Sequence, residues 1–203
     1  MRKDLLTVLG ERVVVADGAM GSLLFDRRVD GASCYDALNL TDATLVQSIH
    51  QAYVAAGAEV IESNTFGANR VKLGRFDLAH KTREINLRGA GLARSQAGET
   101  RWVAGAMGPL GRMGEEQPSQ AELEDVFAEQ ALALVEGGAD FIMLETFASL
   151  SLLLTALRGV KAAVGVPVAA QMVFTQRGRT HSGRTARECF EALILAGAGM
   201  VGL

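Results

Sequence analysis

Two stretches of the chain repeat one another, AGAEVIESNTF at residues 56–66 and GGADFIMLETF at residues 137–147. Each contains a glycine that would end a helix, a short turn with an acidic residue, a buried apolar strand, and a polar residue followed by Thr-Phe. A third copy, AGAGMVGL, begins at residue 196 and stops at Leu203, one residue before the position equivalent to Asn64 and Glu145. The repeat predicts successive helix–strand units whose strands end at one common edge of a sheet.

Short apolar runs alternate with stretches of helical period along most of the chain. The runs are nearly continuous, as in parallel strands covered on both faces. We expect strands at residues 13–16, 59–62, 102–106, 141–144, 168–173 and 200–203. Between them, we expect Thr41 to cap a helix that ends at Gly57, Ser119 and Glu122 to form a capping box, and residues 188–196 to form a later helix. This alternation predicts an α/β fold.

The length of the chain bears on which α/β architecture it forms. An eight-stranded barrel takes about 250 residues, whereas the 203 residues here supply six expected strands. We therefore expect one domain over residues 1–203, an incomplete TIM (β/α)8 barrel of about six βα units that is truncated at its C-terminal end. A complete six-stranded doubly wound sheet is the competing interpretation. The glycine-rich turns at 17–21 and 105–111 lack the G-x-G-x-x-G spacing of a dinucleotide site, which argues against a nicotinamide or flavin domain.

Composition and charge exclude several classes of protein. Twenty Lys and Arg against 23 Asp and Glu give a net charge of −3, without the concentrated positive charge that nucleic acid or an anionic membrane surface requires. No apolar run reaches the roughly 20 residues that span a bilayer, and the apolar N-terminal stretch is interrupted by Glu11 and Arg12. Two cysteines, Cys34 and Cys189, cannot form a disulfide framework. We expect a cytoplasmic protein with no nucleic-acid or membrane partner.

Polar residues at the carboxyl ends of the expected strands are the candidate site, because ligands bind there in both α/β architectures. Asp17 is followed by Gly18 and Ala19, whose backbone N–H groups can receive a carboxylate or phosphate. Glu145 ends a later strand, and together with Asp17 it could hold an ammonium group. A turn that donates to an anion, beside two carboxylates that accept from a cation, suits a free α-amino acid.

Each of these residues also has a structural interpretation. Asp17-Gly18 is a common turn dipeptide. Asn64-Thr65, after the second expected strand, would either line the site or cap the following helix. Glu145 directly follows a buried apolar run, where an unpaired carboxylate is costly, and this favours a site there. We therefore include Asn64 and Thr65 with Asp17 and Glu145 among the candidate binding residues.

Other reactive residue types are better explained as structural. A cluster after the fifth expected strand is interpreted as a solvated loop, although it could attract an anionic cosubstrate; it contains Arg177, Arg179, His181, Arg184 and Arg187. We interpret His50 and His80 as surface or core histidines, Cys34 as a structural residue without a partner in the sequence, and Cys189 as packed on a helix. The lysines fall on helical segments, so a Schiff-base aldolase would lack its strand lysine. No nucleophilic serine, P-loop or complete metal motif is present.

Six segments resemble the homocysteine S-methyltransferase family. They are VADGAMG at 15–21, LNLT at 38–41, ESNTFGAN at 62–69, GAMGP at 105–109, LETF at 144–147 and GRTHSG at 178–183. They occur in the family's order and cover nearly the whole chain. The likeness is greatest to the homocysteine-binding barrels of cobalamin-dependent methionine synthase and of a bacterial enzyme that joins such a barrel to a methylenetetrahydrofolate reductase.

The resemblance implies a (β/α)8 barrel that transfers a methyl group to the sulfur of homocysteine and so forms methionine. In the family, residues at the positions of Asp17 and Glu145 hold the substrate's amino group, and backbone amides of the turn at Gly18 and Ala19 take its carboxylate. The resemblance also implies zinc bound by three cysteine thiolates, which keeps the substrate sulfur as the reactive thiolate. Further C-terminal domains for folate, cobalamin or reductase chemistry are implied partners. The methyl donor, whether methylcobalamin, methyltetrahydrofolate or another, cannot be identified from these residues.

The family's three zinc cysteines have no counterpart in this chain. They follow the sixth strand and a later strand, whereas the chain stops at Leu203, and Cys34 and Cys189 match neither position. We therefore expect no metal site in these 203 residues and no methyl transfer by them alone. The alternative is a non-catalytic amino-acid-binding or assembly fragment that another chain completes. In both cases we expect unpaired barrel edges to favour self-association.

Overall fold

The computed structural model describes residues 2–27, 34–111 and 118–203. Five parallel strands form one sheet whose spatial order, β1-β2-β3-β4-β5, is also the order of the sequence. They are β1 (Val60–Glu62), β2 (Trp102–Met107), β3 (Phe141–Phe147), β4 (Val168–Met172) and β5 (Met200–Gly202). A doubly wound sheet reverses its strand order at a switch point, whereas a barrel wall does not. The doubly wound interpretation is therefore wrong, and the described residues form part of a barrel.

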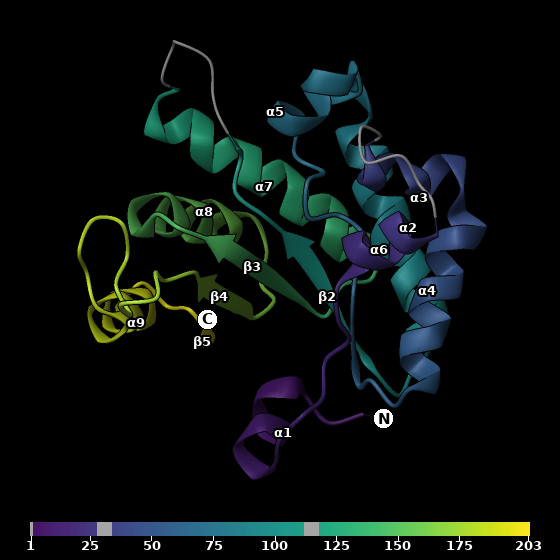
Figure 1. The fold of residues 1–203 in the computed structure, drawn as a ribbon, viewed down its shortest axis with the longest axis horizontal. Helices are drawn as coiled ribbons and strands as arrows, with labels where there is room; N and C mark the ends of the chain where they lie inside the picture. Colours follow the sequence, from purple (N-terminus) through teal and green to yellow (C-terminus); the bar gives the residue numbers. More distant parts are fainter. Residues whose placement is uncertain (1, 28–33, 112–117) are drawn as a thin grey trace.

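Long helices lie on the outer side of this curved sheet and alternate with its strands (Figure 1). They are α4 (Ala43–Ala55), α6 (Thr82–Ala97), α7 (Gln120–Glu136), α8 (Leu150–Ala163) and α9 (Ala186–Leu195). Their apolar faces form a continuous core with outward-facing strand residues such as Ile61, Val103 and Ile142. The predicted capping box of Ser119 and Glu122 is present at the start of α7.

The inner face of the sheet packs against the first helix, α1 (Leu5–Glu11). Leu5 and Val8 contact a cluster of inward-facing strand residues, Val60, Trp102, Ala104, Phe141, Met143 and Ala169. Because successive strand residues point to opposite faces, the residues two positions beyond Val60 and Met143 face the same interior. These residues are Glu62 and Glu145, and they lie at the carboxyl ends of their strands.

Shorter helical segments surround the carboxyl ends of β1 and β2. They are α2 (Met20–Asp26), η1 (Tyr35–Ala37), α3 (Leu38–Thr41), α5 (Arg70–Leu73), η2 (Gly74–Phe76) and η3 (Ala79–Lys81). Residues of α2, η1, α5 and η2 line one cavity there. The loops at this end of the sheet therefore position the candidate site.

Two sequence-based boundaries are wrong. The strand expected at residues 13–16 is reduced to a single bridge between Ala16 and Val60, because this segment lies at the open edge of the sheet, where Val13 and Val15 are 84% and 56% exposed. The described residues thus form a sheet of five strands, to which Ala16 adds one bridge, where six strands were expected. Thr41 ends α3, and the side chain of Asp42 caps α4 by accepting a hydrogen bond from the Leu45 N–H at 3.1 Å.

We expect the isolated 203-residue chain to self-associate through its two open sheet edges. Apolar side chains near these edges are exposed, among them Val13, Leu195 and Leu203, and unpaired parallel strands can pair with another copy. Size-exclusion chromatography with light scattering, at rising protein concentration, should show a rising mean mass. A monodisperse monomer that melts cooperatively would contradict this expectation.

Candidate functional site

A cavity of about 770 Å³ lies at the carboxyl ends of the first three strands. It is lined by residues 17–22, 34–36 and 62–67, together with Lys72, Arg75, Phe76, Ala106 and Glu145. All six candidate binding residues from the sequence, Asp17, Gly18, Ala19, Asn64, Thr65 and Glu145, belong to this lining. Strand ends that are far apart in the sequence thus meet at one cavity, as the repeat predicted.

Asp17 follows the Ala16 bridge, and a backbone group of β1 holds its side chain in place. Both carboxylate oxygens accept hydrogen bonds from the Glu62 N–H, at 3.1 and 3.0 Å. Burial raises the pKa of Asp17 to about 7, the negative charge of Glu145 adds to the shift, and the backbone hydrogen bonds oppose it. The carboxyl group is therefore fixed in orientation at the cavity and titrates near neutral pH.

The turn after Asp17 provides backbone donors. No described residue accepts a hydrogen bond from the N–H groups of Gly18 and Ala19. Tyr53 of α4 holds this turn, since its hydroxyl donates to the Ala19 carbonyl at 3.1 Å. A Cβ atom on Gly18 would lie 3.0 Å from that hydroxyl, so glycine gives the turn its close approach to α4. The two N–H groups are available to an anion in the cavity that this turn lines.

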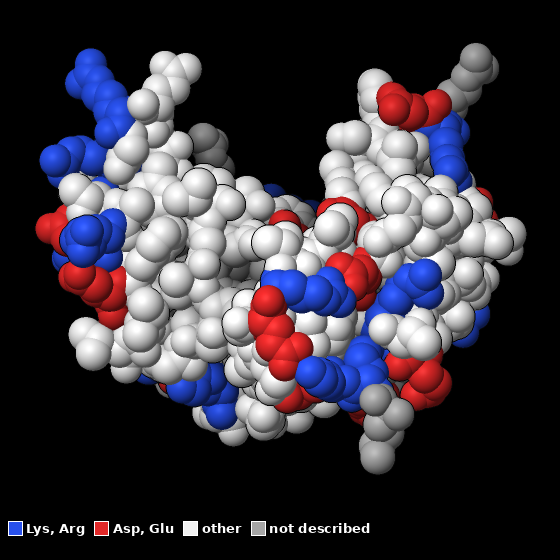
Figure 2. All heavy atoms as spheres, turned by 90° about the horizontal axis from the view of Figure 1, so that it is seen from below, with Lys and Arg blue, Asp and Glu red and all other residues white. Residues whose placement is uncertain are grey.

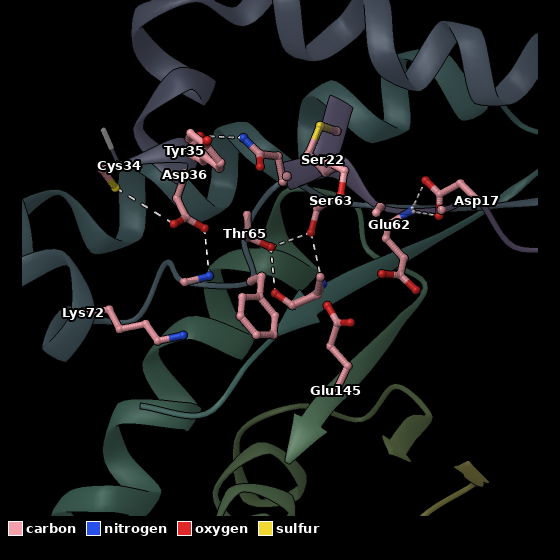
Figure 3. Close-up of a pocket in the computed structure, with 18 of the residues that line it drawn as sticks. Asp17, Ser22, Cys34, Tyr35, Asp36, Glu62, Ser63, Thr65, Lys72 and Glu145 are labelled. Carbon is pink, nitrogen blue, oxygen red and sulfur yellow. Dashed lines mark hydrogen bonds between the residues drawn. The ribbon is translucent and has the colours of Figure 1, made fainter. Parts of the chain in front are cut away.

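Glu145 lies within β3, which continues to Phe147 beyond the end predicted at Leu144. The register with β4 shifts between Leu144 and Phe147, and Thr146 has a φ of 62°, a left-handed conformation that is rare for a β-branched residue. Figure 3 shows that the Glu145 carboxylate points into the cavity. Burial raises its pKa, and the positive charge of Lys72 partly offsets this shift.

Glu62 is a cavity residue that the sequence analysis missed. Its side chain points into the cavity, toward that of Glu145, while its backbone N–H faces Asp17 (Figure 3). Burial raises its pKa to about 8, and the charges of Glu145 and Asp17 add to the shift. The two-residue period of β1 was the available signal: Val60 faces the barrel interior, so Glu62 must face it too.

Asn64 and Thr65 line the cavity wall, but their side chains take part in buried hydrogen bonds. The Asn64 side-chain amide donates to the Tyr35 carbonyl at 2.8 Å, and that of Asn39 donates to the Asn64 carbonyl at 2.7 Å. The Thr65 hydroxyl donates to the Ala106 carbonyl at 2.8 Å. These contacts fix the loop after β1 against η1, α3 and β2. The structure thus places both residues beside the cavity with their polar atoms already bonded.

The opposite wall of the cavity carries a cation. The Lys72 Nζ lies 4.4 Å from the centroid of the Phe66 ring, which is a cation–π contact. Gly108 makes room for this ring, because a Cβ atom at that position would overlap it. Burial lowers the pKa of Lys72, while the carboxylate of Asp36 opposes that shift. The cavity therefore places an acidic wall opposite a lysine.

Of the other residues considered in the sequence, the arginine-rich loop, His50 and Cys189 lie outside this cavity, whereas Cys34 lies at it. The loop cluster with Arg177, Arg179, His181, Arg184 and Arg187 is exposed and contributes nothing to the lining. His50 is buried in α4, its ring nitrogens have no hydrogen-bond partner among the described residues, and burial lowers its pKa to about 4. Cys189 is packed in the outer core, as expected for a structural residue. Cys34 lies at the cavity, with its Sγ 3.9 Å from an Asp36 carboxylate oxygen.

One face of the molecule carries charges of both signs. On the face that Figure 2 shows, Lys and Arg side chains are interspersed with Asp and Glu and do not form a single basic area. Within the described ranges, no helix is both long and apolar enough to span a membrane.

Comparison with known proteins identifies the family. Residues 14–203 match the family model described as homocysteine S-methyltransferase. The chain belongs to this family. The resemblance noted in the sequence is therefore confirmed over nearly the whole chain.

Two methionine synthases align with almost all of the chain. It is 35% identical over 220 residues to the methionine synthase of Mycobacterium tuberculosis and 34% identical over 224 residues to that of Mycobacterium leprae. Each alignment covers 98% of this chain but 18% of the relative, so the chain spans about a fifth of the length of these methionine synthases.

The solved structures confirm the fold. The Escherichia coli homocysteine methyltransferase MmuM superposes with a TM-score of 0.80 in its oxidized form, at 22% identity and over 96% of this chain and 73% of that one. Its metallated form gives a TM-score of 0.83, at 20% identity and over 97% of this chain and 76% of that one. The α/β fold of this family member is thus a partial (β/α)8 barrel.

Proposed function

We propose that this chain is the homocysteine-binding part of a methyltransferase that methylates the sulfur of homocysteine to form methionine. Asp17 and Glu145 bind the ammonium group of homocysteine, and the N–H groups of Gly18 and Ala19 bind its carboxylate. The observation that carries the proposal is the meeting of these residues at one cavity, in a chain that belongs to the homocysteine S-methyltransferase family.

The chemistry of the cavity supports an α-amino acid as its ligand. An α-amino acid carries a cation and an anion on one carbon atom, so its site needs acceptors and donors side by side. The Asp17 carboxylate is adjacent in sequence to the N–H groups of Gly18 and Ala19, which no described residue bonds. Glu145 supplies a second carboxylate from β3. With both charged groups of the substrate held, its side chain is free to present sulfur to a methyl donor.

The zinc that the family resemblance implies does not fit the residues described here. In the described part of the chain, no three His, Cys, Asp or Glu side chains are arranged to hold a metal ion. Cys34 lies at the cavity and Cys189 is packed in the outer core, so they do not form a pair. We therefore assign the described residues of the cavity to substrate binding.

Binding of homocysteine tests this proposal directly. Isothermal titration calorimetry with the protein expressed from its complete reading frame should detect binding of L-homocysteine. It should detect much weaker binding of 4-sulfanylbutanoate, which lacks the ammonium group, and of 3-sulfanylpropylamine, which lacks the carboxylate. Equal affinity for homocysteine and for both analogues would contradict the proposed site.

We also propose that the 203 residues alone do not transfer a methyl group, since the described residues provide no site for the metal that the family uses to activate the sulfur. The purified 203-residue chain, incubated with homocysteine and methyltetrahydrofolate or methylcobalamin, should form no methionine detectable by mass spectrometry. Methionine formation together with stoichiometric zinc in that chain would contradict this expectation.

A further inference from the structure

Glu62 places a third carboxylate at the cavity, beside the two that the proposed function uses. It ends β1, and its backbone N–H holds Asp17 through the two hydrogen bonds described above. Its side chain points into the cavity toward Glu145 (Figure 3), and the charges of both Glu145 and Asp17 act on it. Ala106, on the strand between β1 and β3, is small enough to leave this space open. The carboxylates of residues 17, 62 and 145 are called the acidic cluster below.

The described residues form no salt bridge with this cluster. Within the described ranges, none of the salt bridges includes Asp17, Glu62 or Glu145. Lys72 acts electrostatically on Glu145, but its ammonium group lies over the Phe66 ring. The other titratable groups that line the cavity are Cys34, Tyr35, Asp36 and Arg75, and Tyr53 of α4 contacts its wall at Ala19. Asp26 of α2, Arg70 of α5 and His50 of α4 lie on the same elements but outside the lining.

The cluster is suited to an organic cation. The described carboxylates are not arranged to coordinate a metal ion. An ammonium group has three N–H donors directed away from one nitrogen, and each can reach a different carboxylate. The free N–H groups of Gly18 and Ala19 beside the cluster indicate that this ammonium belongs to a molecule that also carries an anionic group.

We propose that Glu62 is a third substrate-binding carboxylate, which contacts the ammonium group of the amino acid, and that a proton held by the acidic cluster leaves for solvent when the ammonium binds. This inference rests on the proposed function, because it takes the ligand to be the homocysteine or methionine of that reaction. It adds a residue to the site and a coupling between substrate binding and pH.

Binding of the ammonium group should release protons from the acidic cluster rather than add protons to it. Burial and mutual repulsion raise the pKa of Asp17 to about 7 and that of Glu62 to about 8 in the empty site, so the cluster holds at least part of a proton at neutral pH. The positive charge of the ligand favours the ionised carboxylates and lowers these pKa values. Binding therefore releases a proton, and affinity rises with pH below the pKa values of the empty site, about tenfold per pH unit for each proton released.

Calorimetry with L-methionine tests this coupling, because the methionine sulfur carries no proton that could be released instead. The protein from its complete reading frame is titrated at about pH 7 in two buffers with different enthalpies of ionisation, and the difference in observed heat gives the number of protons released. We expect release of roughly half a proton to one proton. 4-(Methylsulfanyl)butanoate, which lacks the ammonium group, should release none.

Glu62→Gln is the decisive variant because it keeps the shape of the side chain and removes its charge and its proton. We expect about tenfold weaker methionine binding or more at pH 8, and less than half of the wild-type proton release. Glu62→Asp should restore part of the methionine affinity and part of the proton release. Glu99→Gln, at an exposed position outside the cavity, is the matched control and should behave as wild type.

The outcomes separate this inference from the proposed function. Unchanged affinity and unchanged proton release in Glu62→Gln, while Glu145→Gln loses binding, would overturn the role of Glu62 and leave the proposed function standing. Absence of both homocysteine and methionine binding in the wild-type protein would overturn the proposed function, and the role of Glu62 with it. Circular dichroism spectra of the variants show whether any loss of binding reflects a loss of fold.

Discussion

Glu145→Gln is expected to weaken homocysteine binding by about a hundredfold or more. Truncating one partner of a largely desolvated charge pair typically costs 2–5 kcal/mol, and each 1.4 kcal/mol is a factor of ten in affinity. Glu145 is partly buried at the cavity, and none of the salt bridges among the described residues includes it, so the substrate ammonium would be its main partner. The glutamine keeps the size of the side chain, and the loss therefore reports its charge.

The analogue without an ammonium group provides the control for this prediction. If Glu145 acts on the ammonium, 4-sulfanylbutanoate should bind Glu145→Gln at least as well as it binds the wild-type protein, because no charge pair is lost. Calorimetry on both proteins with both ligands gives the coupling between side chain and ammonium directly. Equal losses for the two ligands would mean that Glu145 supports the cavity without contacting the ammonium group.

The sequence located Asp17 and Glu145 because each follows an apolar run that predicts a strand, and ligands of α/β folds bind at the carboxyl ends of strands. For Glu145, the cost of an unpaired carboxylate at the end of a buried run added to the argument. The sequence did not locate Glu62. The repeat aligns Glu145 with Asn64, but the two copies differ in strand length: β3 runs on to Phe147, whereas β1 stops at Glu62. Asn64 consequently lies in a turn, and its polar groups bond to Asn39 and to the Tyr35 carbonyl. Those partners are distant in sequence, so no local period reveals them.

The buried strands of the fold were also predictable from the sequence, whereas its edges and helix caps were not. Buried strands such as Phe141–Phe147 are covered on both faces and appear as apolar runs. The segment at 13–16 has the same kind of sequence, yet only Ala16 pairs, because a strand neighbour is present on one side alone. Thr41 and Asp42 are both good capping residues, and only the end of α3 at Thr41 decides between them. Edges and caps depend on neighbours that the local sequence does not contain.

The loop that carries Asn64 and Thr65 depends on a glycine of a distant helix. Gly89 lies in α6, and a Cβ atom there would come within 2.5 Å of both the Asn39 side-chain nitrogen and the Thr65 methyl group. Neither side chain can move away from that Cβ atom easily, because both are buried and hydrogen-bonded. Asn39 is fully buried and donates to the carbonyls of Asn64 and Ile85, and Thr65 is fully buried and bonds to Ala106. Close approach of α6 to this loop is what shapes one wall of the cavity.

We therefore expect Gly89→Ala to lower the free energy of unfolding by roughly 2–4 kcal/mol, through overpacking and broken buried hydrogen bonds. Gly91→Ala, two residues along the same helix, is the matched control: its nearest atom would be 3.9 Å away, and the gain in helix propensity should raise stability by roughly 0.5–1 kcal/mol. Urea denaturation of both variants measures the difference in the free energy of unfolding.

Because the displaced residues form the cavity wall, homocysteine affinity should also fall in Gly89→Ala and remain unchanged in Gly91→Ala. Equal stability of the two variants would mean that the loop adapts to the methyl group and that its hydrogen bonds do not hold the cavity wall in place.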